Sequence, residues 1–135
     1  MVNQILVDSN VILDIFTQDP NWYPWSRNTL NQYGLTHELC INPIIYTEIS
    51  IAFERIEDLE RTMHACRFKW LALPKEALFL AGKIFLQYRR NKGKKVSPLP
   101  DFLIGAHASI LNIPLITRDT KRTLSYFPKL SVITP

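Results

Sequence analysis

Cysteine is scarce in this chain of 135 residues, and its scarcity narrows the kinds of metal site and cross-link that the sequence can build. The two cysteines, Cys40 and Cys66, lack the paired spacing of a zinc site, and the three histidines supply no second ligand pair. A single possible disulfide would say little about the cellular compartment of the protein. We expect both thiols to be reduced. These counts exclude a disulfide scaffold and disfavour a structural zinc site.

Long apolar runs are also missing from the sequence. No uninterrupted apolar stretch approaches the roughly 20 residues of a membrane-spanning helix. The first residues lack the basic and apolar regions of a secretory signal, and no repeat, low-complexity segment or linker interrupts the chain. We therefore expect a cytoplasmic protein, with no membrane partner, whose residues 1–135 form a single domain.

Acidic residues are outnumbered by basic ones. The 12 Asp and Glu residues against 16 Lys and Arg give a net charge of +4, with a pI near 9.2. This modest excess favours an anionic partner such as a nucleic acid. If several acids gather in one pocket, the remaining surface is more basic than the total indicates.

Short apolar strands alternate with helical segments along the chain. We expect strands at residues 4–7, 38–41, 113–117 and 130–133, and helices at residues 9–16, 24–33, 43–56, 57–69, 74–90 and 101–112. Residues 18–23 and the basic stretch 91–100 have the composition of loops. Strands that are separated by helices imply parallel pairing through crossover helices, and hence an α/β sandwich.

Two aspartates directly follow expected strands. Asp8 comes after the first strand and Asp119 after the third. In a parallel sheet both lie at the carboxyl edge, where open α/β sheets bind ligands. Taken alone, each has a structural alternative, which is a helix cap for Asp8 and a turn residue for Asp119.

Glu48 lies within an apolar stripe. At helical spacing its neighbours are Ile44, Ile45, Ile51 and Ala52. A glutamate on that face points to the core or to a cavity, where a lone charge is costly. The pattern therefore favours a functional role for Glu48.

Asp101 opens an expected helix after Pro100. The helix dipole alone favours an acid at this position. However, Ile104, Gly105 and Ala108 share its face, and the two small residues permit close approach to the sheet. We expect Asp101 to point at the same edge as the other acids.

Carboxylates that converge on one edge need a positive charge between them. At 4 Å two carboxylates repel by roughly 4 kcal/mol at an effective dielectric constant of 20. Oxygen ligands without paired His or Cys select a hard ion such as Mg²⁺ or Mn²⁺. The four acids together therefore indicate a divalent-metal site.

Four segments of the chain carry a resemblance to a known family. In order and spacing, "VDSNVILDI", "YTEIS", "PDFLIGAHA" and "LITRD" resemble the motifs of PIN-domain ribonucleases. The overall layout is most similar to the VapC-type toxins of bacterial toxin–antitoxin modules, and the resemblance spans nearly the whole chain. It implies a PIN-like three-layer α/β/α sandwich with a short, mainly parallel central sheet.

The resemblance also implies an activity and a site. It implies that the chain is a Mg²⁺- or Mn²⁺-dependent endoribonuclease, that a cognate antitoxin protein neutralises it, and that it forms a homodimer. The four acids that it places in the catalytic and metal site are Asp8, Glu48, Asp101 and Asp119. Ser9, Asn10 and Thr117 are the supporting residues, which would hold a water molecule or an acid in place.

Basic and aromatic residues near these motifs are candidates for binding RNA. Those that could contact phosphates are Arg89, Arg90, Lys92, Lys94, Lys95 and Arg118. A solvated helix end is the alternative for the first five. Trp22, Tyr23 and Trp25 could stack on bases, although packing of the loop or a protein interface is the favoured interpretation.

Two other functions remain open from the sequence. The first is a non-catalytic RNA-binding or adaptor PIN domain, which the intact set of four acids argues against. The second is a phosphotransferase or phosphatase with an aspartate nucleophile. Such enzymes usually place a second acid two residues after the nucleophile, where this chain has Asn10.

Overall fold

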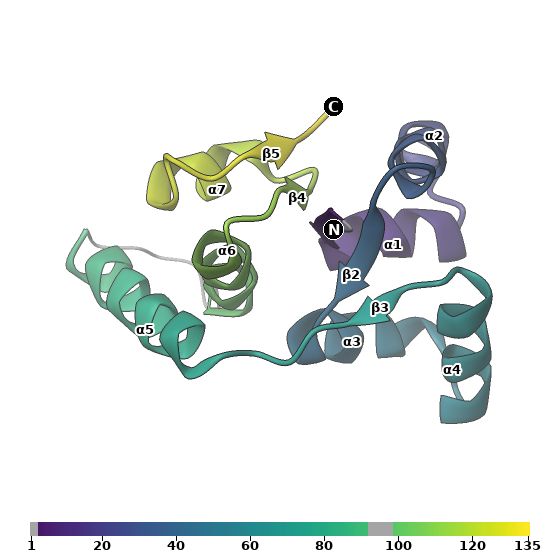
Figure 1. Ribbon diagram of the computed structural model, residues 1–135, viewed down its shortest axis with the longest axis horizontal. Helices are drawn as coiled ribbons and strands as arrows, with labels where there is room; N and C mark the ends of the chain where they lie inside the picture. The colour runs from purple at the N-terminus through teal and green to yellow at the C-terminus, as the bar shows by residue number, and fades with distance from the viewer. Residues whose placement is uncertain (1–2, 92–98) are drawn as a thin grey trace.

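A parallel β-sheet runs through the centre of the computed structural model, which describes residues 3–91 and 99–135 (Figure 1). In chain order the helices and strands are β1 (Gln4–Val7), α1 (Ser9–Phe16), α2 (Tyr23–Gly34), β2 (Glu38–Ile41), α3 (Pro43–Ile49), the 3-10 turn η1 (Ser50–Ala52), α4 (Ile56–Ala65), β3 (Lys69–Trp70), α5 (Lys75–Arg90), α6 (Leu99–Leu111), β4 (Leu115–Ile116), α7 (Thr120–Tyr126) and β5 (Val132–Ile133). The sheet has five strands in the order β3-β2-β1-β4-β5, and all neighbouring strands are parallel.

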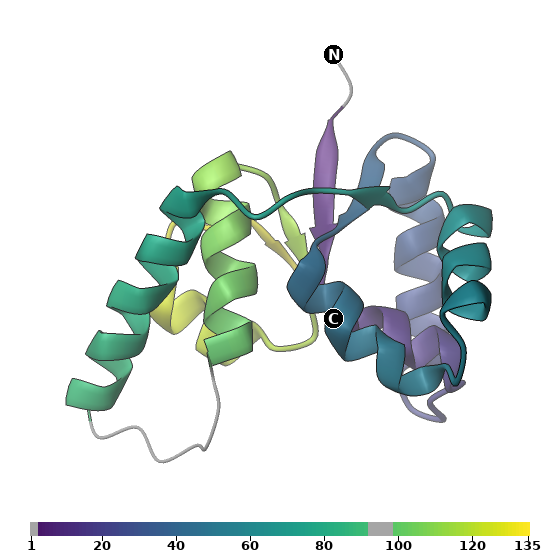
Figure 2. The same cartoon turned by 90° about the horizontal axis from the view of Figure 1, so that it is seen from below.

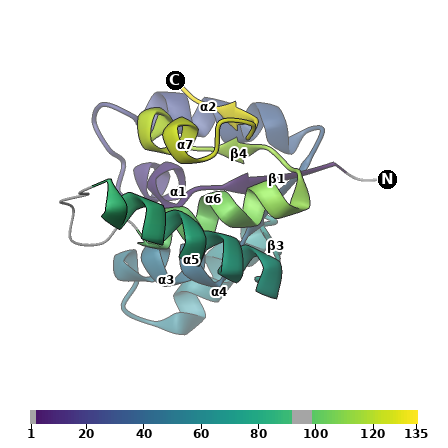
Figure 3. The same cartoon turned by 90° about the vertical axis from the view of Figure 1, so that its left-hand side faces the viewer.

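Helices cover both faces of this sheet. Figure 2 shows α5 and α6 on one side of β1, and α2 and α4 on the other. Figure 3, viewed from the side of α5, shows α5 and α6 in front of β1. This arrangement confirms the predicted α/β sandwich with a short parallel sheet. Within the described residues, every helix is too short or too polar to cross a membrane.

The central strand β1 explains why the sheet is covered on both faces. Ile5, Leu6 and Val7 are fully buried, so side chains that point to opposite faces of the strand are both removed from water. A continuous apolar run of this kind is typical of a parallel strand between two helical layers. Because β1 pairs with both β2 and β4, its carboxyl end lies at the middle of the sheet edge.

The segment 43–56 forms a shorter helix than the sequence indicates. The helix α3 ends at Ile49, the 3-10 turn follows, and Phe53 has an extended backbone before α4 begins at Ile56. The side chain of Ile51 is consequently 79% exposed. The prediction of one continuous helix is wrong, because the apolar period continues in the sequence after the backbone has left the helix.

Two elements were absent from the sequence prediction. The strand β3 consists of two exposed residues, and its backbone pairing with β2 rather than an apolar pattern defines it. The helix α7 lies in a polar stretch and begins where the Asp119 side chain accepts a hydrogen bond from the backbone N–H of Arg122. Neither element has the hydrophobic periodicity on which the prediction depended.

Gly105 lets α6 approach the C-terminal part of the chain. A Cβ atom at this position would lie 2.4 Å from Cε2 and 2.7 Å from Cδ2 of the Phe127 ring, which is itself buried. We expect Gly105→Ala to lower the free energy of unfolding by about 1–3 kcal/mol through overpacking.

Chemical denaturation measures this effect, and Gly82→Ala is the matched control. Gly82 is exposed on α5, and an added Cβ would meet no described atom within 4 Å. The better helix propensity of alanine should stabilise that variant by about 0.5–1 kcal/mol. Equal effects of the two substitutions would contradict the close contact at Phe127.

Candidate active site

Asp8 lies at the carboxyl end of β1, where its backbone N–H donates to the carbonyl oxygen of Ile116 at 2.9 Å. It occupies the N-cap position of α1, yet its side chain makes no capping hydrogen bond within the described structure. Instead, Asp8 Oδ2 accepts a hydrogen bond from Thr117 Oγ1 at 2.7 Å, and Oδ1 lies 3.4 Å from Ser9 Oγ. The carboxylate is therefore directed to the sheet edge, and the helix-cap alternative is wrong for this side chain.

Ser9 connects Asp8 with Glu48. Its Oγ donates to Glu48 Oε1 at 2.8 Å and has the longer contact of 3.4 Å to Asp8 Oδ1. A hydroxyl has a single proton, so the shorter contact is the one that it satisfies. Ser9 thus holds a carboxylate from α3 beside the one that follows β1, and its supporting role in a reaction stays a prediction.

Burial and nearby carboxylates raise the pKa of both Asp8 and Glu48. Burial, with further contributions from Asp101 and Glu48, raises the pKa of Asp8 from 3.8 to about 6, against the lowering effect of the Thr117 hydrogen bond. Burial and Asp101 also raise the pKa of Glu48, although the Ser9 hydrogen bond opposes them. Asp8, Glu48 and Asp101 therefore share one negative pocket, where a cation is stabilised.

Arg122 supplies a positive charge to the outer part of this pocket. Its Nη1 donates a hydrogen bond to Asp101 Oδ2 and lies 3.9 Å from Asp119 Oδ2. The other oxygen of Asp119 accepts from the backbone N–H of Arg122 at 3.4 Å and caps α7. Asp119 therefore caps α7, whereas the structural alternative given for it from the sequence was a turn residue. Its other oxygen lies near the guanidinium that binds Asp101.

Thr117 joins the two aspartates that follow strands. Its buried Oγ1 donates to Asp8 and accepts a hydrogen bond from the backbone N–H of Asp119 at 3.0 Å. The hydroxyl consequently uses both its donor and its acceptor capacity. Thr117 therefore fixes the position of Asp8 relative to Asp119, and its supporting role in a reaction stays a prediction.

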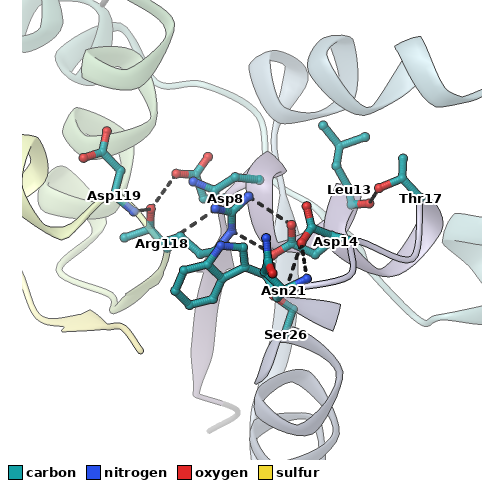
Figure 4. Close-up of polar contacts among 12 residues, drawn as sticks. Asp8, Leu13, Asp14, Thr17, Asn21, Ser26, Arg118 and Asp119 are labelled. Atoms are coloured by element: carbon teal, nitrogen blue, oxygen red, sulfur yellow. Dashed lines mark hydrogen bonds and ion pairs between the residues drawn. The ribbon is translucent and has the colours of Figure 1, made fainter. Parts of the chain in front are cut away.

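Asp14, which the sequence analysis did not include in the site, holds Arg118. The carboxylate is 2% exposed and accepts from Arg118 Nε at 2.8 Å, Arg118 Nη2 at 3.0 Å and Ser26 Oγ at 2.7 Å (Figure 4). The Arg118 guanidinium also lies 5.2 Å from the centroid of the Trp22 ring. The spacing of Asp14 one helical turn after Asn10 was the available signal in the sequence.

The Asn10 side chain fixes the loop that contains Arg118 by a hydrogen bond to the backbone of that loop. Its Oδ1 accepts a hydrogen bond from the Arg118 N–H at 3.4 Å. Together with the bidentate Arg118–Asp14 pair, this contact attaches the segment between β4 and α7 to helix α1. The consequence is that Thr117 and Asp119 are held at a defined place beside Asp8.

Asn42 was also missed, and it positions the helix that bears Glu48. Its Oδ1 accepts from the backbone N–H of Ile45 at 2.9 Å and caps α3, while its Nδ2 lies 2.9 Å from Nδ1 of the buried His107. His107 belongs to α6, the helix of Asp101. The pair therefore ties the helix of Glu48 to the helix of Asp101.

The expected RNA-binding residues fall into three groups. Arg89 and Arg90 are exposed in the last turn of α5, whereas Lys92, Lys94 and Lys95 lie outside the described residues. Arg118 is engaged by Asp14 and Trp22, which agrees with the packing interpretation of the aromatic segment. A role of these residues in binding RNA stays a prediction.

The acids form two pairs rather than one ready-made metal cage. Within residues 3–91 and 99–135, no three His, Cys, Asp or Glu side chains form a group that could hold a metal ion. Asp8 and Glu48 share Ser9, and Asp101 and Asp119 share Arg122. The residues nevertheless fit a divalent ion, because their donors are oxygens, their charge is in excess, and a guanidinium already binds to two of them.

Comparisons with known proteins agree with this architecture. One similar structure is VapBC2 from Rickettsia felis bound to a promoter DNA fragment, with 18% identity, a TM-score of 0.72, and coverage of 97% of this chain and 98% of that chain. A toxin–antitoxin complex from Klebsiella pneumoniae has 23% identity, a TM-score of 0.70 and 97% coverage of both chains. DNA-bound VapBC from Salmonella typhimurium has 19% identity, a TM-score of 0.71, and coverage of 99% and 98%.

Comparison of the sequence finds a family but no individual curated relative. No curated protein matches the chain significantly. The model of the PIN domain family matches residues 5–129, which include all four candidate acids. The chain therefore belongs to the PIN domain family.

Proposed function

We propose that this protein is a divalent-metal-dependent endoribonuclease that hydrolyses RNA phosphodiesters, with residues 1–135 acting as one VapC-type nuclease domain. The observation that carries the proposal is the buried carboxylate of Asp8, which the Thr117 hydroxyl directs to the sheet edge beside Glu48 and Asp101. Membership of the PIN domain family supports a nuclease. The excess of basic residues supports an anionic substrate.

The four acids would hold Mg²⁺ or Mn²⁺ at this edge, with Asp8 and Asp101 as the central ligands and Glu48 and Asp119 beside them. The chemistry that a bound divalent ion supplies is stabilisation of charge on the phosphodiester and a nucleophile at neutral pH. The Thr117 hydroxyl keeps Asp8 Oδ2 oriented, and the Ser9 hydroxyl does the same for Glu48 Oε1. Such preorganisation places the charge where the reaction needs it.

Glu48 is the residue best suited to accept a proton from the attacking water. Its side chain is partly exposed, and burial together with Asp101 raises the pKa of its carboxyl group. A general base works best when its pKa approaches the working pH. Ser9 donates to only one of the two Glu48 oxygens among the described contacts, so Oε2 is the atom that we assign to the proton.

The two alternative functions fit the structure less well. A non-catalytic RNA-binding or adaptor domain would not need an acid whose pKa is raised by burial and, further, by neighbouring acids. An aspartate-nucleophile phosphotransferase would use the position of Asn10, whose side chain accepts from the Arg118 backbone. The local contacts therefore favour hydrolysis over transfer to Asp8.

Cleavage of RNA by the purified protein tests the proposal. With Mg²⁺ or Mn²⁺ we expect a structured RNA to be cut at internal positions, with gel electrophoresis and mapping of the new ends as the measurements. Excess EDTA should abolish cleavage, since the acids then have no divalent ion, and restored Mg²⁺ should recover it. Cleavage at an unchanged rate in EDTA would overturn the metal mechanism.

We also propose that a cognate antitoxin protein binds this chain as part of a type II toxin–antitoxin pair. Similar structures are complexes of VapBC or of a toxin with its antitoxin. A groove of about 420 Å³ with many apolar side chains lies along α1 and α2, and Leu35 at its border is 87% exposed. An apolar protein segment is the partner that such a groove fits.

A homodimer in the cytoplasm completes the proposed assembly. The helices α5 and α6 leave Phe79, Leu86 and Ile110 exposed, which is costly for an isolated chain in water. Burial of these side chains against a second copy would remove that cost. The RNA substrate, the antitoxin and the second copy are then the three partners of the protein.

A further inference from the structure

Arg122 places a permanent positive charge on two acids of the proposed metal site. Its guanidinium donates to Asp101 Oδ2 and lies 3.9 Å from Asp119 Oδ2. The Arg122 side chain is 18% exposed, whereas the exposed pair Arg61–Asp58 has values of 76% and 50%. Because it is partly desolvated, the contact of Arg122 is stronger than an ordinary surface ion pair.

The local backbone keeps Arg122 at this position. Arg122 lies in the first turn of α7, and the Asp119 carboxylate accepts from its backbone N–H while facing its guanidinium. Asp119 therefore contacts Arg122 through both of its oxygens. The start of the helix therefore places the Cα of Arg122 within reach of both acids, while its side chain keeps its rotamer freedom.

We propose that Arg122 is an internal counter-ion of the active site, which holds Asp101 and Asp119 until a divalent ion displaces its guanidinium. The inference rests on the proposed function, because it concerns the same four acids. Arginine stays charged at every physiological pH, so only movement of the side chain can release the acids. The affinity of the site for metal is consequently lower than its four carboxylates alone would give.

A space for the displaced side chain lies next to the contact. A groove of about 340 Å³ borders Arg122 and is lined also by Asp119, Lys121, Ser125 and Tyr126. An arginine side chain can rotate into such a groove without a change of the backbone. The exchange of guanidinium for metal therefore requires only a change of rotamer.

Binding of Mn²⁺ in the absence of RNA tests the inference. Calorimetric titration should show that Arg122→Gln binds Mn²⁺ about tenfold more tightly than the unchanged protein, because the ion no longer competes with a charge-assisted hydrogen bond. Arg122→Lys keeps the positive charge but loses the planar fork, and its affinity should lie between the two. Circular dichroism confirms that each variant is folded.

Lys121→Gln is the matched control, since it removes one positive charge from the neighbouring residue, for which no contact with the acids is described. Its affinity for Mn²⁺ should stay within about twofold of the unchanged protein, given screening by salt. If Lys121→Gln and Arg122→Gln change the affinity for Mn²⁺ equally, the change in net charge alone explains the result. That outcome would overturn the role of Arg122.

The remaining outcomes separate this inference from the proposed function. Mn²⁺ binding by the unchanged protein together with equal or weaker binding by Arg122→Gln would overturn the counter-ion alone. Absence of binding in both proteins would overturn the metal site, and with it both the proposed function and the counter-ion. Tighter binding by Arg122→Gln supports both.

Discussion

Asp8→Asn is expected to lower metal-dependent RNA cleavage by about 100-fold to 1000-fold and to leave the protein folded. Asparagine retains an oxygen that can accept the hydrogen bond from Thr117 Oγ1, so the local packing is preserved. It removes the negative charge that the Thr117 hydroxyl directs to the sheet edge. Initial rates on one RNA, measured at saturating Mg²⁺ for both proteins, give the ratio directly.

The same substitution should stabilise the metal-free protein at neutral pH. The pKa of Asp8 is raised from 3.8 to about 6, so the folded state disfavours its ionised form. The cost is absent below about pH 4, grows as the pH rises toward 6, and reaches about 3 kcal/mol above that. Urea denaturation in EDTA should therefore show Asp8→Asn to be the more stable protein at pH 7, with little difference at pH 4.

Asp58→Asn serves as the control for this pair of measurements. Asp58 is an exposed acid of α4 and pairs with Arg61. It is not one of the four candidate acids. Its loss should change stability by less than about 1 kcal/mol and should leave the cleavage rate unaltered. An Asp8→Asn protein that cleaves RNA at the original rate would exclude Asp8 from the catalytic site.

Arg118→Met is expected to lower the free energy of unfolding by about 3–5 kcal/mol. The substitution leaves Asp14, which is 2% exposed, with Ser26 as its one remaining described hydrogen-bond donor. An ionised carboxylate in that position has lost its compensating charge, although methionine fills much of the volume of the arginine stem. Thermal or urea unfolding at pH 7 measures the loss.

A double-mutant cycle shows whether the buried charge causes this loss. In the Asp14→Asn background, Arg118→Met should cost much less than in the unchanged protein, because no buried charge remains to be compensated. Arg61→Met removes an arginine from an exposed pair and should cost at most about 1 kcal/mol. Additive effects at Asp14 and Arg118 would contradict the coupling that the bidentate contact indicates.

Part of the proposed site was accessible to sequence reasoning because strand ends have a local signature. Asp8 follows three apolar residues that are fully buried, and the PIN-like motifs occur in order along the chain. The apolar stripe that drew attention to Glu48 is only partly buried, since Ile51 is exposed, and a hydrogen bond from Ser9 fixes the glutamate.

Elements that depend on distant partners could not be predicted in this way. The strand β3 is defined by pairing with β2, and the helix α7 begins with a side-chain cap in a polar stretch. Neither has an apolar period, because neither contributes a continuous face to the core. The inclusion of Asp14 required knowledge that Arg118 reaches it from a position 104 residues later in the chain.

The sequence by itself determined the family and the alternation of strands and helices, and it singled out four acids as candidates for a site. These features follow from local hydrophobic periodicity and from motifs that can be read along the chain. Only the tertiary structure decided which group holds each acid, with Thr117 on Asp8 across 109 residues and Arg122 between Asp101 and Asp119. The physical reason is that a hydrogen bond depends on position to within tenths of an ångström, which packing of the whole sheet and its helices sets.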